Sequence, residues 1–175
     1  MPPSDPHAAA FRRLFEAEAA YVWVTLRRLG VRDADVEDLA HELFLKVHAK
    51  LGDYDASRPA KPWLFAFAFR IASDYRRKGH QKNEVLGDVE SPSEALSAEE
   101  MLALRDERDL LKAALATVDL ERRAVLVAYE MDEIPMKDIA ASMEIPVNTA
   151  YSRLRLAREE LARAFARLSK RGALP

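Results

Sequence analysis

Cysteine is absent from the 175-residue sequence, and glycine occurs only five times. A chain without thiols forms neither disulfides nor thiolate metal sites, which is typical of proteins in the reducing cytoplasm. No apolar run approaches the roughly 18 residues that a membrane-spanning helix requires. The N-terminal residues have neither the basic nor the apolar region of a secretory signal peptide. We therefore expect a cytoplasmic protein without membrane insertion.

Sequence motifs for catalysis and metal binding are also missing. The chain has no P-loop, no nucleophile elbow and no dinucleotide-binding glycine pattern. His41 and His48 stand too far apart in sequence for the HExxH zinc motif, which places both histidines on one helical turn. The acidic residues of segment 33–42 are interpreted as the solvated start of a helix rather than as metal ligands. The sequence thus predicts no catalytic residue, no metal and no cofactor, and hence no enzyme.

The charges of the chain are segregated, although its net charge is only −2. Segment 70–82 has five bases and one acid, and segment 149–171 has seven bases and two acids. Between them, segment 84–109 has nine acids and two bases. Because charges farther apart than about 10 Å are screened at moderate salt, local charge decides what a surface attracts. Two basic blocks therefore leave nucleic-acid binding open despite the negative total.

The fold class predicted from composition and periodicity is all-α. Alanine, leucine, arginine and glutamate dominate, and apolar residues recur at helical spacing over 9–29, 36–50, 63–78, 99–116 and 120–131. Segment 81–98 has several acids and serines, one glycine and one proline without such spacing, and is interpreted as a flexible acidic linker. The predicted organisation is therefore two small helical domains, 9–80 and 99–168.

The aromatic residues of segment 63–78 are divided between two predicted roles. This helix is apolar almost all round, which is typical of a central helix. Trp63 and Phe67 are expected in the core. Phe65 and Phe69 lie on another face, where we expect them to meet a partner or to stack on a base.

A helix-turn-helix is the main interpretation of segment 134–161. Met136–Met143 forms a first short helix, Glu144–Pro146 a turn, and a second helix starts near Val147. Hydroxyl, phenol and guanidinium groups cover the outer face of the second helix and suit a DNA major groove. These residues are Thr149, Tyr151, Ser152, Arg153, Arg155 and Arg158. An ordinary helical hairpin with a solvated basic face remains open on this stretch alone.

Three motifs resemble those of one bacterial family. Segment 35–47, DVEDLAHELFLKV, resembles the DAEDLVQEVFLRV run of extracytoplasmic-function sigma factors. Segment 63–78, WLFAFAFRIASDYRRK, and segment 118–161, with its helix-turn-helix, are similar to the later motifs of that family, in the same order. The resemblance spans about 9–168. It implies a sigma region 2 helical bundle, a sigma region 4 helix-turn-helix, and promoter-specific transcription initiation with core RNA polymerase.

The resemblance also implies roles for particular residues. The residues implied to dock on the β′ clamp helices of polymerase are Asp35, Asp38, Leu39, Glu42 and Phe44. Binding of the −10 element falls to Tyr54, Ser57, Arg58, Lys61, Arg70, Arg76, Arg77 and Lys78. The outer face of the second helix, with the six residues named above, would read the −35 element. The polymerase β flap and an anti-sigma factor are further implied partners.

Several positions depart from the family pattern, Arg70 and Glu144 among them, and two rival functions remain. Arg70 stands where the family usually has asparagine, and Glu144 replaces the glycine of the turn. If Glu144 is left-handed, its side chain costs roughly 1 kcal/mol. The first rival is a stand-alone helix-turn-helix transcription regulator, which would need no polymerase-docking helix. The second is a helical adaptor that does not bind DNA.

Overall fold

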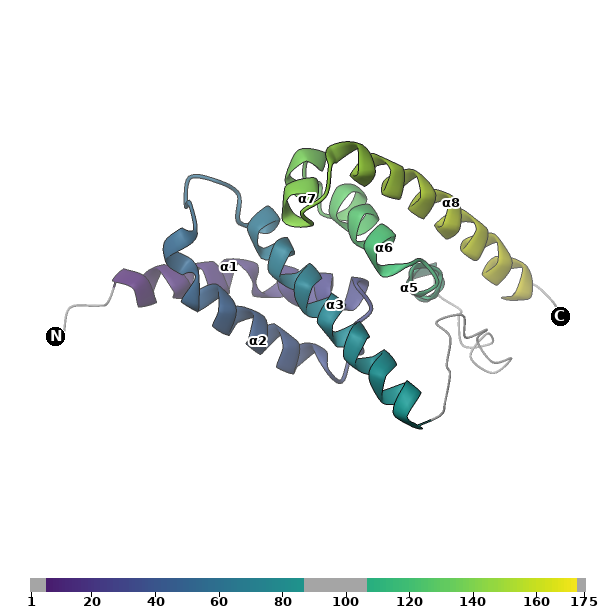
Figure 1. The fold of residues 1–175 in the computed structure, drawn as a ribbon, viewed down its shortest axis with the longest axis horizontal. Coiled ribbons are helices and arrows are strands. Elements are labelled where there is room, and N and C mark those ends of the chain that lie inside the picture. Colours follow the sequence, from purple (N-terminus) through teal and green to yellow (C-terminus); the bar gives the residue numbers. More distant parts are fainter. Residues whose placement is uncertain (1–5, 87–106, 173–175) are drawn as a thin grey trace.

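The structure is a computed structural model that describes residues 6–86 and 107–172. Every regular element in these two ranges is helical, which confirms the predicted all-α class (Figure 1). The predicted linker 81–98 lies mostly outside the described residues, because only 81–86 are among them. Those six residues are helical rather than irregular.

The first domain consists of three helices that pack against one another. They are α1 (Pro6–Arg28), α2 (Val36–Ala49) and α3 (Ala60–Leu86), with a 3-10 turn at Leu51–Asp53 between α2 and α3. Gly30 follows the end of α1 and terminates it. Gly30 adopts φ +97°, and the next amide donates to the carbonyl of Leu26 at 3.1 Å.

Helix α3 is longer than its sequence pattern indicated, since it was expected to end at 78. It passes through Gly79 and continues to Leu86. A glycine inside a helix costs only about 1 kcal/mol relative to alanine, and no proline follows it before the end of α3. Gly79 therefore weakens α3 without terminating it.

The second domain consists of α5 (Glu107–Ala116), α6 (Leu120–Leu126), α7 (Met136–Ser142) and α8 (Val147–Gly172). Asp119 caps α6, since its carboxylate accepts from the amide of Glu121 at 3.2 Å. After α6 the chain makes a π-helical turn over Val127–Met131. The predicted helix 99–116 is described only from 107 onward, and α8 runs four residues past its expected end at 168.

The two domains pack against each other where α7 lies on α3 (Figure 1). Buried apolar residues of both domains form one continuous core. At this boundary the carboxylate of Asp132 is buried and forms an ion pair with Arg28 of α1 at 3.0 Å. Burial raises the pKa of Asp132, while Arg28, Tyr21 and Lys61 lower it. The helix-turn-helix is thereby held over the first half of α3.

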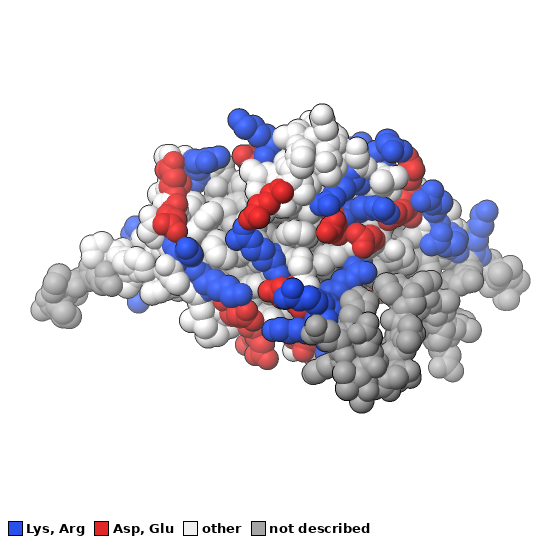
Figure 2. Space-filling model, viewed as in Figure 1, with Lys and Arg blue, Asp and Glu red and all other residues white. Residues whose placement is uncertain are grey.

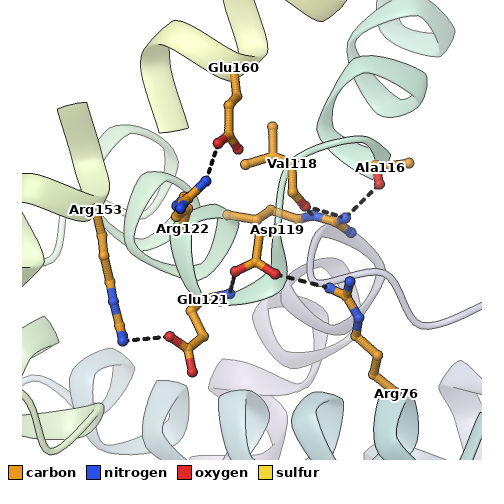
Figure 3. A network of polar contacts seen from close by, with 9 residues as sticks. Arg76, Ala116, Val118, Asp119, Glu121, Arg122, Arg153 and Glu160 are labelled. Carbon is orange, nitrogen blue, oxygen red and sulfur yellow. Dashed lines mark hydrogen bonds and ion pairs between the residues drawn. The ribbon is translucent and has the colours of Figure 1, made fainter. Parts of the chain in front are cut away.

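Arg123 is a buried cation beside this boundary. Its guanidinium donates to the carbonyls of Val118 and Ala116, both at 2.8 Å, and so caps the end of α5. Burial, followed by the neighbouring Arg76, lowers the pKa of Arg123 to about 10. A Cβ atom placed on Gly30 would lie 2.6 Å from Nη1 of Arg123. The second domain therefore approaches the first closely here, and Figure 3 shows Arg76 reaching across to Asp119.

The position of the Phe65 side chain contradicts the prediction made from the sequence. It is 0% exposed and is among the largest fully buried side chains, so it belongs to the core and not to a partner-facing surface. Trp63 is half-buried, and its ring stacks on Tyr54 with 4.8 Å between centroids. The buried side of α3 thus includes a face that was expected to meet a partner or a base, because α3 packs on α1, α2 and α7.

Glu133 carries strain that a substitution should relieve. It is exposed and has φ 55°, a left-handed value that a side chain disfavours. We expect Glu133→Gly to raise the free energy of unfolding by about 1 kcal/mol, as measured by urea denaturation. Glu133→Ala keeps the Cβ atom and is the matched control. Equal stability of the two variants would contradict this account.

Candidate nucleic-acid and polymerase interfaces

The turn between α7 and α8 is tight and left-handed at one residue. Glu144 has φ 57°, as expected for a residue in the place of a turn glycine. Its amide donates to Ala141 at 3.2 Å, and the amide of Ile145 donates to Ala140 at 3.0 Å. These bonds close α7, so that α8 leaves the turn at a fixed angle. The arrangement is that of a helix-turn-helix, in which α7 braces α8.

The outer face of α8 presents the residues predicted to read DNA. The inner face is fixed by the buried side chains of Ala150, Leu154 and Ala157. Between these positions, Tyr151 is 52% exposed, and Ser152 and Arg155 are also exposed. Thr149 is half-buried at the start of the helix, and Arg158 is exposed one turn after Leu154. The structure therefore brings the six predicted residues together along one helix.

Acidic neighbours hold the guanidinium groups of α8. Arg153 pairs with Glu121 of α6 at 2.5 Å, and Arg155 pairs with Glu159 one turn along α8 at 2.8 Å. Arg158 bonds to Glu130, which lies in the π-helical turn. Figure 3 shows Arg153 reaching toward Glu121 rather than straight outward. Arg155 is thus the most exposed of the three and the best placed to reach a base edge, whereas Arg153 is held toward α6.

The loop before α3 is ordered by its own side chains. The Ser57 hydroxyl and amide both donate to Asp55, at 2.6 and 2.9 Å, and these bonds lower the pKa of Asp55. The Tyr54 hydroxyl donates to the carbonyl of Arg58 at 3.0 Å. Lys61 lies over the ring of Tyr21, 5.4 Å from its centroid. The polar groups predicted for the −10 element therefore sit on a defined loop.

A cavity of about 310 Å³ lies between this loop, the start of α3 and α7. The stacked rings of Tyr54 and Trp63 line one side, together with Arg58. Asp138 and Ser142 of α7 line the other side. Aromatic faces beside a cation are groups that bind unpaired bases. The structure thus places an aromatic wall next to the predicted −10 residues.

The basic residues of α3 divide into two groups. Arg70 pairs with Glu144 at 2.5 Å, and Arg76 lies 3.9 Å from Asp119, so both contact the second domain. Arg77 instead pairs with Asp74 one turn earlier on α3 at 2.9 Å, and Lys78 is exposed. Figure 2 shows cationic and anionic side chains side by side over the face in view, rather than one continuous basic surface.

The outer face of α2 carries the predicted polymerase contacts, with one correction. Asp38 is exposed, and Glu42, one turn on, pairs with Lys46 at 2.8 Å. Phe44 is only 4% exposed and packs against the aromatic rings of α1, so its side chain is not available to a partner. The residue that sequence reasoning missed is Leu45, which is 60% exposed. Helical spacing puts Leu45 on the same face as Asp38 and Glu42, and this spacing was readable from the sequence.

The other two predicted docking residues, Asp35 and Leu39, already make contacts within the chain. The carboxylate of Asp35 accepts from Arg32 at 2.9 Å and from the hydroxyl of Tyr75 at 2.5 Å. It thereby ties the start of α2 to α3. Leu39 is half-buried against the core. Asp38, Glu42 and Leu45 are therefore the side chains on this face of α2 that remain accessible to a partner.

Within 6–86 and 107–172, no group of three or more histidine, cysteine, aspartate or glutamate side chains is placed to hold a metal ion. None of the helices in the described part of the chain has the length and hydropathy needed to cross a membrane.

Comparison with known proteins decides the family. The Sigma-70 region 2 family matches residues 14–82, and the Sigma-70 region 4 family matches residues 108–161. The chain is 31% identical to the ECF RNA polymerase sigma factor SigL of Mycobacterium tuberculosis, over 86% of this chain and 85% of that protein. The chain belongs to the extracytoplasmic-function sigma factors. As a sigma factor it binds core RNA polymerase and directs initiation at promoters.

Other sigma factors are similar in sequence or in fold. The ECF RNA polymerase sigma-E factor of Escherichia coli is 24% identical over 75% of this chain and 74% of its own length. The sigma factor RpoE of Bartonella quintana, in complex with the anti-sigma factor NepR, superposes with a TM-score of 0.73 at 18% identity, over 90% of this chain and 97% of that one. CnrH in complex with the cytosolic domain of CnrY superposes with a TM-score of 0.61 at 22% identity, over 89% and 86%. Helices α1–α3 are hereafter the region 2 domain, and α5–α8 the region 4 domain.

Proposed function

We propose that this sigma factor divides its work among three surfaces. The outer face of α2, with Asp38, Glu42 and Leu45, docks on core polymerase. The loop before α3 and the basic side of α3 bind the −10 element and aid promoter melting. The outer face of α8 reads the −35 element. The observation that carries this division is the placement of α8, which the left-handed turn at Glu144 and the buried Ala150 fix with its polar residues outward.

The α2 surface suits a basic partner helix. Two carboxylates one turn apart share this face with the exposed Leu45, which lies one turn after Glu42 and adds an apolar side chain beside the acidic pair. The resemblance in the 35–47 motif assigns this surface to the β′ clamp helices, and the β flap is a further proposed polymerase contact. Neither domain needs to bind DNA tightly on its own, because tethering both domains to one polymerase raises their effective concentration at the promoter. This explains how a chain of net charge −2 works on DNA.

With these three binding surfaces, the sigma factor is proposed to act as a specificity subunit with no catalysis of its own. It acts in the cytoplasm, where its polymerase is, and it needs no cofactor. An anti-sigma factor is a further proposed partner. This is supported by the similar fold of RpoE, whose structure was solved in complex with the anti-sigma factor NepR. Such a partner would cover the polymerase- and DNA-binding faces until a signal releases it.

The stand-alone regulator and the helical adaptor make different predictions from the sigma factor. Transcription in vitro with the purified chain and core polymerase tests all three. We expect transcripts that start at defined promoters only when the chain is present, and sequencing them would yield the promoter elements. A chain that binds those promoters equally well without polymerase, and yields no specific transcript with it, would contradict the proposal.

Arg155 tests the assignment of α8. We expect Arg155→Ala to weaken −35 recognition by about 1–3 kcal/mol, because a bidentate base contact is lost. Preference among −35 sequences in a promoter library transcribed in vitro should relax at one position. Arg163→Ala removes the same group from an exposed position farther along α8 and is the control. The same loss in both variants would show that general charge, not base reading, is responsible.

A further inference from the structure

The start of α8 carries an exposed apolar pair, Val147 and Tyr151. Val147 is 40% exposed and Tyr151 is 52% exposed. The two residues lie four positions apart, so their side chains are neighbours on one side of the helix. Among the residues that the structure describes, no hydrogen bond or ring contact involves the Tyr151 side chain. Single exposed apolar side chains are common, but two adjacent ones on a helix that meets DNA indicate contact with an apolar group of the partner.

The apolar pair continues along α8 into a cation. Arg155 follows Tyr151 by a further four residues, so Val147, Tyr151 and Arg155 form one line along the helix. The other two arginines are held to the side, since Arg153 pairs with a carboxylate of α6 and Arg158 with one in the π-helical turn. The line therefore presents two apolar side chains and then one accessible guanidinium.

The charge around this line suits DNA. Segment 145–158 contains three arginines and no acidic residue. The first turn of α8 lacks an acid as well, although the helix dipole favours aspartate and glutamate at that position. In helix-turn-helix proteins the N-terminal residues of the second helix contact base edges in the major groove. The apolar pair is thus continuous with the proposed −35 surface, and we take base edges to be its partner.

The major groove offers one methyl group, that of thymine at C5. The other features by which the base pairs are told apart there are hydrogen-bond donors and acceptors, which a valine side chain cannot satisfy. A branched aliphatic side chain and an aromatic ring both gain by covering a methyl group and excluding water from it. An arginine suits guanine instead. Four residues of helix rise by about 6 Å, so neighbouring members of the line face positions no more than about two base pairs apart.

We propose that Val147 and Tyr151 select thymine in the −35 element by contact with its C5-methyl group, within about two base pairs of the guanine read by Arg155. This inference deepens the proposed function and rests on it, since that function assigns α8 to the −35 element. It adds Val147 to the residues that determine promoter specificity. It also assigns the Tyr151 contact to the ring rather than to the hydroxyl.

Deoxyuridine tests this contact, because it pairs with adenine as thymidine does and lacks only the methyl group. The full chain with core polymerase is first used to find the −35 element by transcription of a promoter library. Each thymine of that element, on either strand, is then replaced singly by deoxyuridine. Competition between the two promoters in one transcription reaction should show a loss of about threefold to fivefold at one or two positions, as expected for one buried methyl group.

Variants of the apolar pair show whether these side chains cause the loss. Val147→Ala and Tyr151→Ala should each abolish the preference for thymine over deoxyuridine at one position, whereas Tyr151→Phe keeps the ring and should keep the preference. The controls are Val24→Ala on α1 and Phe165→Ala farther along α8, which truncate side chains that are each 40% exposed. Both controls should retain the full preference. All these positions are exposed, so the fold should persist in every variant.

Three results would overturn the thymine contact. They are a −35 element without thymine beside the guanine on either strand, no loss with deoxyuridine at any position, and a loss that persists in both alanine variants. The last two results would assign the apolar pair to a protein partner instead. Arg155→Ala separates this inference from the proposed function. If promoter-specific transcripts are absent or do not respond to Arg155→Ala, the proposed function fails and the inference with it; if they respond while deoxyuridine has no effect, only the thymine contact fails.

Discussion

Replacing both Asp38 and Glu42 with arginine is expected to weaken binding of core RNA polymerase by at least about 100-fold. The two carboxylates lie one turn apart on the outer face of α2, and the exposed Leu45 follows one turn after Glu42 on the same face. Reversing them would place like charges against the basic clamp helices. Such juxtaposition costs several kcal/mol at an interface, and each 1.4 kcal/mol is a tenfold change in affinity. Co-purification and a fluorescence titration with core polymerase would measure the loss.

The fold should survive the double reversal. Neither carboxylate is buried, and the only described ion pair between them and the rest of the chain is that of Glu42 with Lys46 on the same helix. Far-ultraviolet circular dichroism and the urea midpoint should therefore stay close to the wild type. The control is Glu107→Arg with Asp109→Arg, which changes the net charge equally at exposed positions of α5. Normal polymerase binding by the Asp38/Glu42 variant, or equal loss in the control, would contradict the docking surface.

Helix positions were predictable because helical periodicity is a local property of the sequence. Apolar residues at helical spacing located α2 and α7 to within two residues of their observed ends. The ends of α3 and α8 were harder, because a single Gly79 does not decide between a helix that stops and one that continues. The π-helical turn at 127–131 left no local signal that could have been distinguished from an ordinary helix.

Helix faces were less predictable than helix positions, since a face depends on which neighbours pack on it. Helix α2 packs on α1 and α3, and its apolar stripe correctly indicated a buried side, but the family resemblance also assigned the buried Phe44 to polymerase docking. Helix α3 packs on α1, α2 and α7, so almost all of its sides are apolar and its sequence does not say which aromatic points where. The face of Leu45, by contrast, was predictable, because its spacing from Asp38 already placed both residues on one side of the helix.

The interdomain pairs lay beyond sequence reasoning altogether. Arg70 and Glu144 were each singled out as departures from the family pattern, for separate reasons. The structure shows that these two unusual residues contact each other at 2.5 Å across 74 positions of sequence. A pairing between residues so far apart depends on how two domains dock, which no local propensity encodes. The two departures together thus mark one contact between the two domains.

Phe65→Ala is expected to destabilise the chain by about 3–5 kcal/mol. The ring is fully buried in the core beneath α3, and truncating a buried phenylalanine loses its transfer free energy and leaves a cavity. This is a large share of the roughly 5–15 kcal/mol that stabilises a typical domain. Urea unfolding followed by tryptophan fluorescence would measure it, since Trp63 lies on the same helix.

Phe69→Ala is the matched comparison for this substitution. Phe69 lies one turn further along α3, its ring stacks on that of Phe65 at 6.4 Å, and it is only half-buried. We expect its truncation to cost clearly less stability, because part of its surface already faces water. If Phe65 instead faced a DNA base, its alanine variant would unfold at the wild-type urea concentration and lose only single-strand binding. That result would overturn the placement of Phe65 in the core and restore the face of α3 that the sequence had suggested.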